Sequence, residues 1–185
     1  MTKRNVHDDM VRGAAELLAA RGVQGTSFSE VLAHTGAPRG SIYHHFPGGK
    51  GELVEAAVRS VGDGVTVLLE SLDAASPAKL VDTFVDGWRT VLVAGDYERG
   101  CAVAASCLGS DATDELRTVS GEIFRSWRDA LARAFVRSGA ARRQAEDLAT
   151  VCIAGVEGAL IVGRAEHDDA VFDALKRQLR RLAAP

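Results

Sequence analysis

Apolar residues recur at three- and four-residue spacing over most of the chain, which is the period of amphipathic helices. The first such stripe covers residues 3–20 and stops before Gly22, a residue that commonly ends a helix. Its members are Val6, Met10, Ala14, Leu17 and Leu18. Ser27-Phe-Ser-Glu30 then has the form of a capping box, and it predicts a second, short helix that ends at Thr35-Gly36.

The rest of the chain continues the helical pattern. Pro38 suits the first turn of a third helix, because its missing N–H would have no partner there, and this helix ends by Phe46. Six further helices are expected at about residues 50–71, 77–94, 101–109, 111–137, 142–164 and 168–182. Only 5% of the residues are aromatic and alanine is frequent, so the sequence predicts an all-α fold of about nine helices.

Charge is distributed unevenly along the chain. The net charge is −3, but residues 1–50 contain six Lys/Arg and four Asp/Glu, whereas the remaining 135 contain 16 and 21. Four of the five histidines also lie in residues 1–50. A mildly basic head on an acidic body permits contact with a nucleic acid.

Cysteine usage and hydropathy bear on the compartment. The three cysteines, Cys101, Cys107 and Cys152, are odd in number and sit in apolar helical patterns, which favours reduced, buried thiols over a disulfide scaffold. We found no run of about 18 apolar residues, and the N-terminus becomes amphipathic where a signal peptide would stay apolar. We therefore expect a cytoplasmic protein without membrane contact.

The stretch GAPRGSIYHHFPGGKGELVEAAV, residues 36–58, is the most informative in the chain. A metal site is disfavoured, because His44 and His45 point about 100° apart on a helix and no further ligand lies nearby. A phosphate loop is disfavoured too, since Lys50 is followed by no Ser/Thr and the first glycine of that motif is replaced by His44. We expect neither a metal nor a cofactor.

Two short helices around a turn with Gly36 have the layout of a helix-turn-helix. The first helix can pack on Ile42 and Phe46, which lie one turn apart on the second. The opposite face would then display the residues suited to DNA, with a glycine that allows close approach, an arginine that reads guanine, and donors to phosphates. These residues are Arg39, Gly40, Ser41, Tyr43, His44, His45 and Lys50.

Residues 28–58, FSEVLAHTGAPRGSIYHHFPGGKGELVEAAV, resemble the helix-turn-helix signature of the TetR family of transcriptional repressors. The matching positions are Gly36, Gly40, Ile42, Tyr43, His45, Phe46, Lys50 and Leu53. His44 stands where the family often has an aromatic residue, and the loop before Lys50 is one residue longer than usual. Both departures resemble the branch that includes the lincomycin-resistance repressor, and weaker similarity in residues 100–111, 124–131 and 155–166 extends over most of the chain.

The resemblance implies a three-helix DNA-binding domain, residues 1–48, followed by a helical ligand-binding and dimerisation domain, residues 49–185. It also implies phosphate contacts at Thr26 or Ser27, Tyr43, His45 and Lys50, and base reading at Arg39, Gly40 and His44. The partners implied are a double-stranded DNA operator, a second copy of the chain and a small-molecule inducer.

The C-terminal half offers candidates for an apolar ligand site. Trp88, Phe124 and Trp127 fit either the core or the lining of such a pocket. Glu157 interrupts the apolar run VCIAGVEGALIV, so its carboxylate needs a partner, either an arginine such as Arg125, Arg128 or Arg164, or a ligand donor. The expected site consists of Trp88, Leu92, Cys101, Ala105, Phe124, Trp127 and Glu157.

Two questions stay open at this point. Gly155, Ala159 and Gly163 recur every four residues, and the series fits close packing either between two subunits or within one. A redox-sensing regulator is the alternative function, with Cys101 after Glu98-Arg99-Gly100 as its best thiol. A helical enzyme is less favoured, because no nucleophile, base and orienting group stand in supporting positions. We expect a dimeric repressor that leaves a palindromic operator when it binds a small apolar or aromatic ligand.

Overall fold

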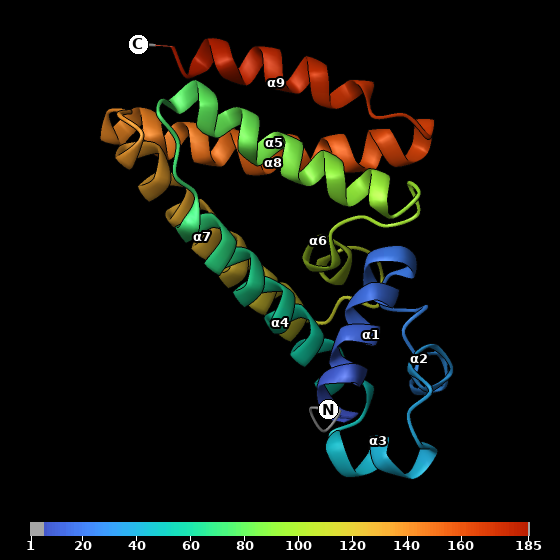
Figure 1. Cartoon of the computed structure of the whole chain (residues 1–185). Coiled ribbons are helices and arrows are strands. Elements are labelled where there is room, and N and C mark those ends of the chain that lie inside the picture. Colours follow the sequence, from blue (N-terminus) through green and yellow to red (C-terminus); the bar gives the residue numbers. More distant parts are fainter. Residues whose placement is uncertain (1–5, 185) are drawn as a thin grey trace, which may run out of the picture. The chain divides into compact units, whose positions relative to one another are not determined.

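The structure, a computed structural model, describes residues 6–184 and is helical throughout, with no strand in that range (Figure 1). The all-α prediction is therefore confirmed. The nine helices within the described residues are α1 (Val6–Arg21), α2 (Phe28–Thr35), α3 (Arg39–His45), α4 (Lys50–Ser71), α5 (Pro77–Ala94), α6 (Ala102–Cys107), α7 (Asp114–Arg137), α8 (Arg142–Glu166) and α9 (Ala170–Leu182).

The helix ends differ from the predicted ends where a cap was overlooked. α7 begins at Asp114 and not at Asp111, because the Thr113 hydroxyl accepts a hydrogen bond from the Leu116 N–H at 3.3 Å and so caps the helix. α8 continues to Glu166 and ends on His167 in the left-handed conformation, φ 53°. The predicted residues 3–5 of the first helix lie outside the described part.

The helices form two compact units. The first consists of the described residues up to Asp63 together with Ala102–Ile123, and the second of Gly64–Cys101 with the residues from Phe124 onward. The boundary falls inside α4 and α7, which each contribute to both units. These units are clusters of spatial contacts, so they differ in kind from the division at residue 48, which stays a prediction.

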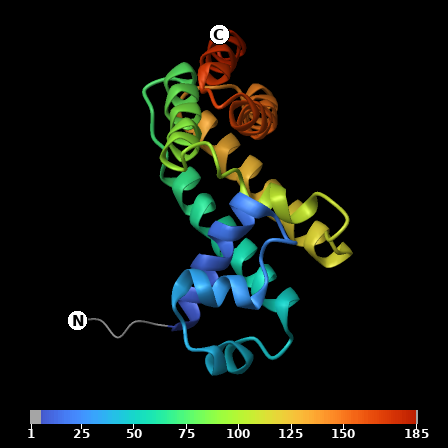
Figure 2. The same cartoon turned by 90° about the vertical axis from the view of Figure 1, so that its right-hand side faces the viewer.

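In the second unit α5, α8 and α9 pack against one another, as both views show (Figures 1 and 2). Small residues of α8 let its neighbours approach closely. A Cβ at Gly155 would lie 2.6 Å from the Leu175 side chain of α9, and one at Gly163 would lie 2.7 Å from the Leu92 side chain of α5. Ala159, which lies between Gly155 and Gly163 in the sequence of α8, is buried. The four-residue repeat of small residues thus serves packing within the chain.

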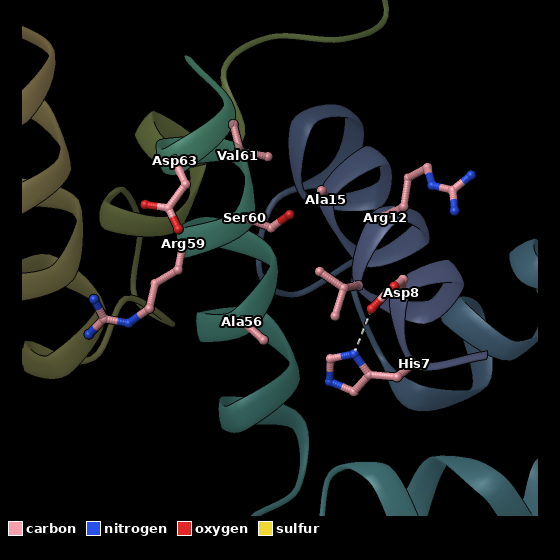
Figure 3. Close-up of a pocket in the computed structure, with 10 residues that line it drawn as sticks. His7, Asp8, Arg12, Ala15, Ala56, Arg59, Ser60, Val61 and Asp63 are labelled. Carbon is pink, nitrogen blue, oxygen red and sulfur yellow. Dashed lines mark hydrogen bonds and ion pairs between the residues drawn. The ribbon is translucent and has the colours of Figure 1, made fainter. Parts of the chain in front are cut away.

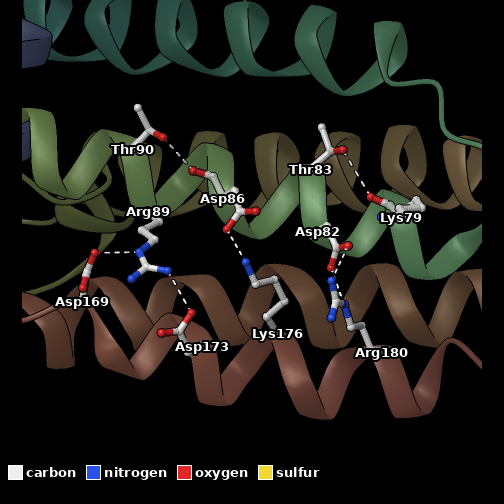
Figure 4. A network of polar contacts seen from close by, with 10 residues as sticks. All are labelled: Lys79, Asp82, Thr83, Asp86, Arg89, Thr90, Asp169, Asp173, Lys176 and Arg180. Atoms are coloured by element: carbon white, nitrogen blue, oxygen red, sulfur yellow. Dashed lines mark hydrogen bonds and ion pairs between the residues drawn. The ribbon is translucent and has the colours of Figure 1, made fainter.

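A row of ion pairs joins α5 to α9 (Figure 4). Arg89 donates to Asp169 at 2.6 Å and to Asp173 at 2.9 Å, and Lys176 donates to Asp86 at 2.6 Å. Arg180 contacts both oxygens of Asp82. These pairs recur along the two helices, so they fix the register of α9 on α5 while the apolar residues between the helices supply the core.

Among the described residues, α8 contains one long apolar stretch. By length and composition it could cross a membrane, with a mean hydropathy of 1.6 over its most apolar 18-residue window. This differs from the sequence prediction of no long apolar run, which rested on the interruption of the stretch by Glu157 and Arg164. The core helix of a soluble protein passes the same test, and α8 buries nine residues, among them Cys152, Val156 and Leu160.

Candidate nucleic-acid interface

The first helix of the predicted motif, α2, is capped at both ends. The Ser27 hydroxyl accepts from the Glu30 N–H at 3.2 Å, as the capping box requires. At the other end Gly36 adopts φ 68°, a left-handed conformation that favours glycine, and its N–H donates to the Leu32 carbonyl at 2.9 Å. The turn is therefore set by backbone geometry that the sequence encodes at Gly36.

The second helix, α3, begins directly after Pro38 and spans only Arg39–His45. It is anchored by its apolar side: Ile42 is fully buried, and so is Val31 of α2. Phe46 at the end of α3 is 1% exposed, and its N–H donates to the Ile42 carbonyl at 2.9 Å. The pattern of buried positions leaves the opposite side of α3 facing solvent.

α1 supports α2 at a close contact that the sequence analysis missed. A Cβ at Gly13 would lie 2.4 Å from Cγ2 of Thr35, so only glycine allows α2 to pack this near to α1. Two polar contacts flank that point, from His34 to Glu16 at 2.8 Å and from Arg21 to Glu30 at 2.9 Å. The contact fixes the position of α2 on α1, and α3 packs against both helices.

The outward side of α3 carries the predicted base-reading residues. Arg39, Gly40 and His44 are exposed, and a Cβ at Gly40 would meet nothing within 4 Å. Tyr43 is 70% exposed, and its ring stands edge-on to Phe28 with 5.5 Å between the ring centroids. Together they present a guanidinium, an imidazole and a phenol on one exposed side.

A hollow of about 390 Å³ adjoins this side, between α2 and α3. Arg39 and Tyr43 line it together with the apolar side chains of Phe28 and Leu32. Its mix of apolar surface and one guanidinium suits the sugars and phosphates of a nucleic-acid strand as well as base edges.

The remaining predicted contacts are less exposed. Ser41 donates to the Pro38 carbonyl at 2.6 Å, so its hydroxyl already serves the start of α3. His45 is half-buried, and its ring lies edge-on to that of His7 at 5.7 Å. Lys50 is the first residue of α4 and partly exposed, where its ammonium group can reach an anion without desolvation of the whole side chain.

Thr26 does not fit the predicted role of a phosphate contact. Its side chain is fully buried, and the hydroxyl donates to the Gly22 carbonyl at 2.9 Å. A buried hydroxyl with a satisfied donor closes the loop between α1 and α2 and offers nothing to a phosphate. Of the two alternatives, Ser27 at the N-terminus of α2 is the partly exposed one.

A second hollow in the same unit, about 630 Å³, lies between α1 and α4 (Figure 3). Its lining bears charges of both signs, from Asp8 and Asp63 and from Arg12 and Arg59. Arg12 is paired with Asp9 at 2.7 Å, and Arg59 with Glu55 at 2.8 Å. Charges that are mixed and already paired select no particular ligand.

The predicted ligand-site residues are divided between the units. Six lie in the second unit, but Ala105 belongs to α6 in the first. Phe124 and Trp127 of α7 stand edge-to-face with centroids 5.4 Å apart, and Trp88 of α5 lies 6.0 Å from Trp127. Trp127 and Leu92 are fully buried, so they belong to the core, whereas Trp88 and Phe124 keep some exposure.

Glu157 and the cysteines stand in an apolar environment. Burial raises the pKa of the Glu157 carboxyl to about 7, and a hydrogen bond from Cys101 opposes the rise. Burial also raises the pKa of the Cys152 thiol to about 12, which suppresses the reactive thiolate. Cys101 is buried, and Cys107 donates to the Ala104 carbonyl at 3.3 Å. These environments do not favour a redox sensor.

Comparison with known proteins agrees with the geometry. Residues 11–57 match the family described as "Bacterial regulatory proteins, tetR family", and residues 77–178 match the "Transcriptional regulator LmrA/YxaF-like, C-terminal domain". The chain is 36% identical over 179 residues to the HTH-type transcriptional regulator Rv0196 of Mycobacterium tuberculosis, covering 94% of this chain and 91% of that protein. It is 29% identical to the HTH-type regulator YxaF of Bacillus subtilis, covering 91% and 90%.

Solved structures share the fold. The regulatory protein TetR from Rhodobacter sphaeroides superposes with a TM-score of 0.82 at 22% identity, covering 97% of this chain and 99% of that one. The helix-turn-helix is thus a DNA-binding domain of a transcriptional regulator, a class that is not enzymatic. Both domain matches and the relative in M. tuberculosis lead to one conclusion: the chain belongs to the TetR family of transcriptional regulators, with a C-terminal domain of the LmrA/YxaF type.

Proposed function

We propose that the protein is a cytoplasmic, homodimeric repressor that binds a palindromic operator and leaves it when a small apolar or aromatic ligand binds the C-terminal body. The observation that carries the proposal is the exposed side of α3. Arg39, Tyr43 and His44 are exposed there, whereas Ile42 on the same helix is buried in the core. A rigid short helix with polar residues on its outer side fits the major groove of B-DNA.

The contacts divide into two classes. Arg39 and His44 would read base edges, and Gly40 would let the helix backbone come close to the bases, because no side chain stands in the way. Phosphate contacts would come from Ser27 at the start of α2, from Tyr43, and from Lys50 at the start of α4. His45 and Ser41 have partners within the fold, so we give them a supporting role in positioning α3.

A second copy of the chain would dock on α8. Its outward side is an apolar stripe, with Val151 43% exposed and Ile161 62% exposed, and the exposed Ala154 and Gly158 between them. The spacing follows the helical period, so these residues form one continuous face about three turns long. Two copies related by a two-fold axis would bury this face and present two recognition helices to half-sites about 34 to 36 Å apart or a multiple of that.

Ligand release would follow from differential affinity. A ligand shifts the dimer between two states only to the extent that it binds them unequally. In the second unit, Trp88 and Phe124 keep some exposure beside the buried Trp127, and they supply apolar surface of the kind that lines ligand sites. The ligand would favour a state with lower affinity for the operator.

The experiment that tests DNA binding compares Lys50→Ala with Arg143→Ala, which removes an exposed cation of α8 in the second unit. Binding to DNA from upstream of the gene is measured by fluorescence anisotropy from 50 to about 300 mM salt. Loss of a phosphate contact should weaken binding to all sequences and flatten the slope of log K against log salt by about 1 per site. Arg143→Ala should keep the wild-type slope.

If Lys50→Ala keeps that slope as well, Lys50 is not at the interface. If the wild type binds no DNA in a salt-dependent manner, the proposed function is wrong.

A further inference from the structure

One polar atom is buried without a partner among the described residues. Oε1 of Glu157, on α8, is inaccessible to solvent and has no hydrogen-bond partner. The carboxyl group accepts a hydrogen bond from the thiol of Cys101. Cys101 is itself 6% exposed and precedes α6, so both groups lie inside the second unit.

The structural alternative for this carboxylate was an ion pair. No arginine contributes to the shift of the Glu157 pKa, and Oε1 has no hydrogen-bond partner. Arg125 and Arg164, two of the expected partners, have exposed side chains. The stability of the fold therefore does not account for the carboxylate.

A thiol is a weak donor, so it offsets little of the cost of burying a carboxyl group. An unsatisfied polar atom in an apolar environment costs from about 1 to several kcal/mol. Buried polar atoms left without a partner in native proteins call for an explanation by a role, such as binding. The remaining way to satisfy Oε1 is a donor from outside the chain.

We propose that Glu157 is the polar anchor of the effector site, and that the effector is an apolar molecule that presents an O–H or N–H donor to Oε1. The inference rests on the proposed ligand response and names the chemistry of the ligand. Above a pH of about 7, where the carboxyl group is ionised, a carboxylate or phosphate would bring a second negative charge against it, so these groups are excluded as the anchored group. Phenols, alcohols, amides and amines remain.

The charge of the chain favours the same class. Residues 51–185 contain 21 acidic and 16 basic side chains. An acidic body repels anions and tolerates neutral or cationic molecules. The Glu157 carboxyl group thus selects a ligand with a hydrogen-bond donor, and the excess of acidic side chains in residues 51–185 disfavours a negatively charged ligand.

The test uses four compounds on one scaffold: 4-hydroxybiphenyl, 4-(aminomethyl)biphenyl, 4-methoxybiphenyl and biphenyl-4-carboxylate. They present a neutral donor, a cationic donor, no donor and an anion. Binding to the full-length protein is followed by the fluorescence of its two tryptophans, Trp88 and Trp127, both in the second unit. The variants are Glu157→Met, which removes the acceptor, Glu157→Gln, which keeps an acceptor without charge, and the control Glu166→Met at the exposed end of α8.

In the wild type and in Glu166→Met, the hydroxy compound should bind at least about tenfold more tightly than the methoxy compound, which corresponds to one hydrogen bond to a charged or polar group. Glu157→Met should abolish this preference. Glu157→Gln should keep it for the hydroxy compound and reduce affinity for the amine. Because Met is close to Glu in volume, the methoxy compound serves as the internal control for packing.

Equal binding of hydroxy and methoxy compounds to the wild type overturns the inference, and so does a preference that survives in Glu157→Met or tightest binding of the carboxylate. Failure of all four compounds to bind counts against the proposed ligand response itself. Binding without any dependence on a donor leaves that response in place and removes only the anchor.

Discussion

The buried carboxyl of Glu157 makes the stability of the protein depend on pH in a way that can be calculated. Burial raises its pKa from 4.5 to about 7 in the folded chain, whereas the unfolded chain titrates near 4.5. Between these values the folded state holds a proton that the unfolded state has lost. The stability from this group is therefore fully present below about pH 4.5 and declines as the pH rises to about 7.

The magnitude follows from the same two values. A tenfold change in proton affinity corresponds to about 1.4 kcal/mol, so the rise from 4.5 to about 7 corresponds to about 3 kcal/mol lost between acid and alkaline pH. Glu157→Gln has nearly the same shape and no charge, so it removes this dependence. Any penalty from the buried amide is the same at every pH and leaves the difference between pH values unaffected.

The assay is urea unfolding of the wild type and Glu157→Gln between pH 5 and 8.5, followed by circular dichroism. The difference in unfolding free energy between the two proteins should change by about 2.5 kcal/mol in favour of the variant as the pH rises across that range, because part of the full effect is already lost at pH 5. Cys101→Ala removes the thiol donor that opposes the pKa rise, so it should move the midpoint of the change to higher pH. Parallel stability curves for the wild type and Glu157→Gln would refute the burial argument.

Two further predictions concern packing and the ion pairs. Gly13→Ala should destabilise the first unit and weaken DNA binding, because the new Cβ would lie 2.4 Å from Cγ2 of Thr35. The control Gly64→Ala places its Cβ in open space on α4, so it should stabilise the fold by up to about 1 kcal/mol in thermal unfolding. A gain in stability from Gly13→Ala would contradict the close contact. For the Asp82 and Arg180 pair, a double-mutant cycle with Asp82→Asn and Arg180→Gln should give a coupling below about 1 kcal/mol that declines with salt; a coupling independent of salt would argue against a screened surface pair.

Much of the fold could be predicted because the signals are local. The capping box at Ser27 and the left-handed Gly36 set the bounds of α2, and both act through backbone groups a few residues away. The buried positions Ile42 and Phe46 follow from helical spacing alone. The start of α7 was misplaced by three residues because Asp111 and Thr113 are both good caps, and a sequence does not show which hydroxyl or carboxylate takes the role.

The exposure of the candidate DNA contacts was harder to predict, because tertiary packing decides it. Thr26 and Ser27 are adjacent and chemically alike. The Thr26 side chain is buried and donates to the Gly22 carbonyl, whereas the Ser27 side chain caps α2. Gly13 passed unnoticed, since a glycine inside a helix has no distinct signal until its neighbour, Thr35, is in place. Ala105 belongs to the first unit and the other six expected ligand-site residues to the second, and a sequence does not show how its residues divide between two units.

The partner of the Glu157 carboxyl group could not be predicted from the sequence. An acidic residue in an apolar helix must be paired, protonated or anchored to a ligand, and the sequence offers arginines enough for the first answer. The three-dimensional arrangement removes that answer, because the carboxyl meets a thiol and no guanidinium. The proposed role as a ligand anchor explains why such a residue is retained, and the stability lost as the pH rises to about 7 is then the cost of burying an acceptor for a ligand donor.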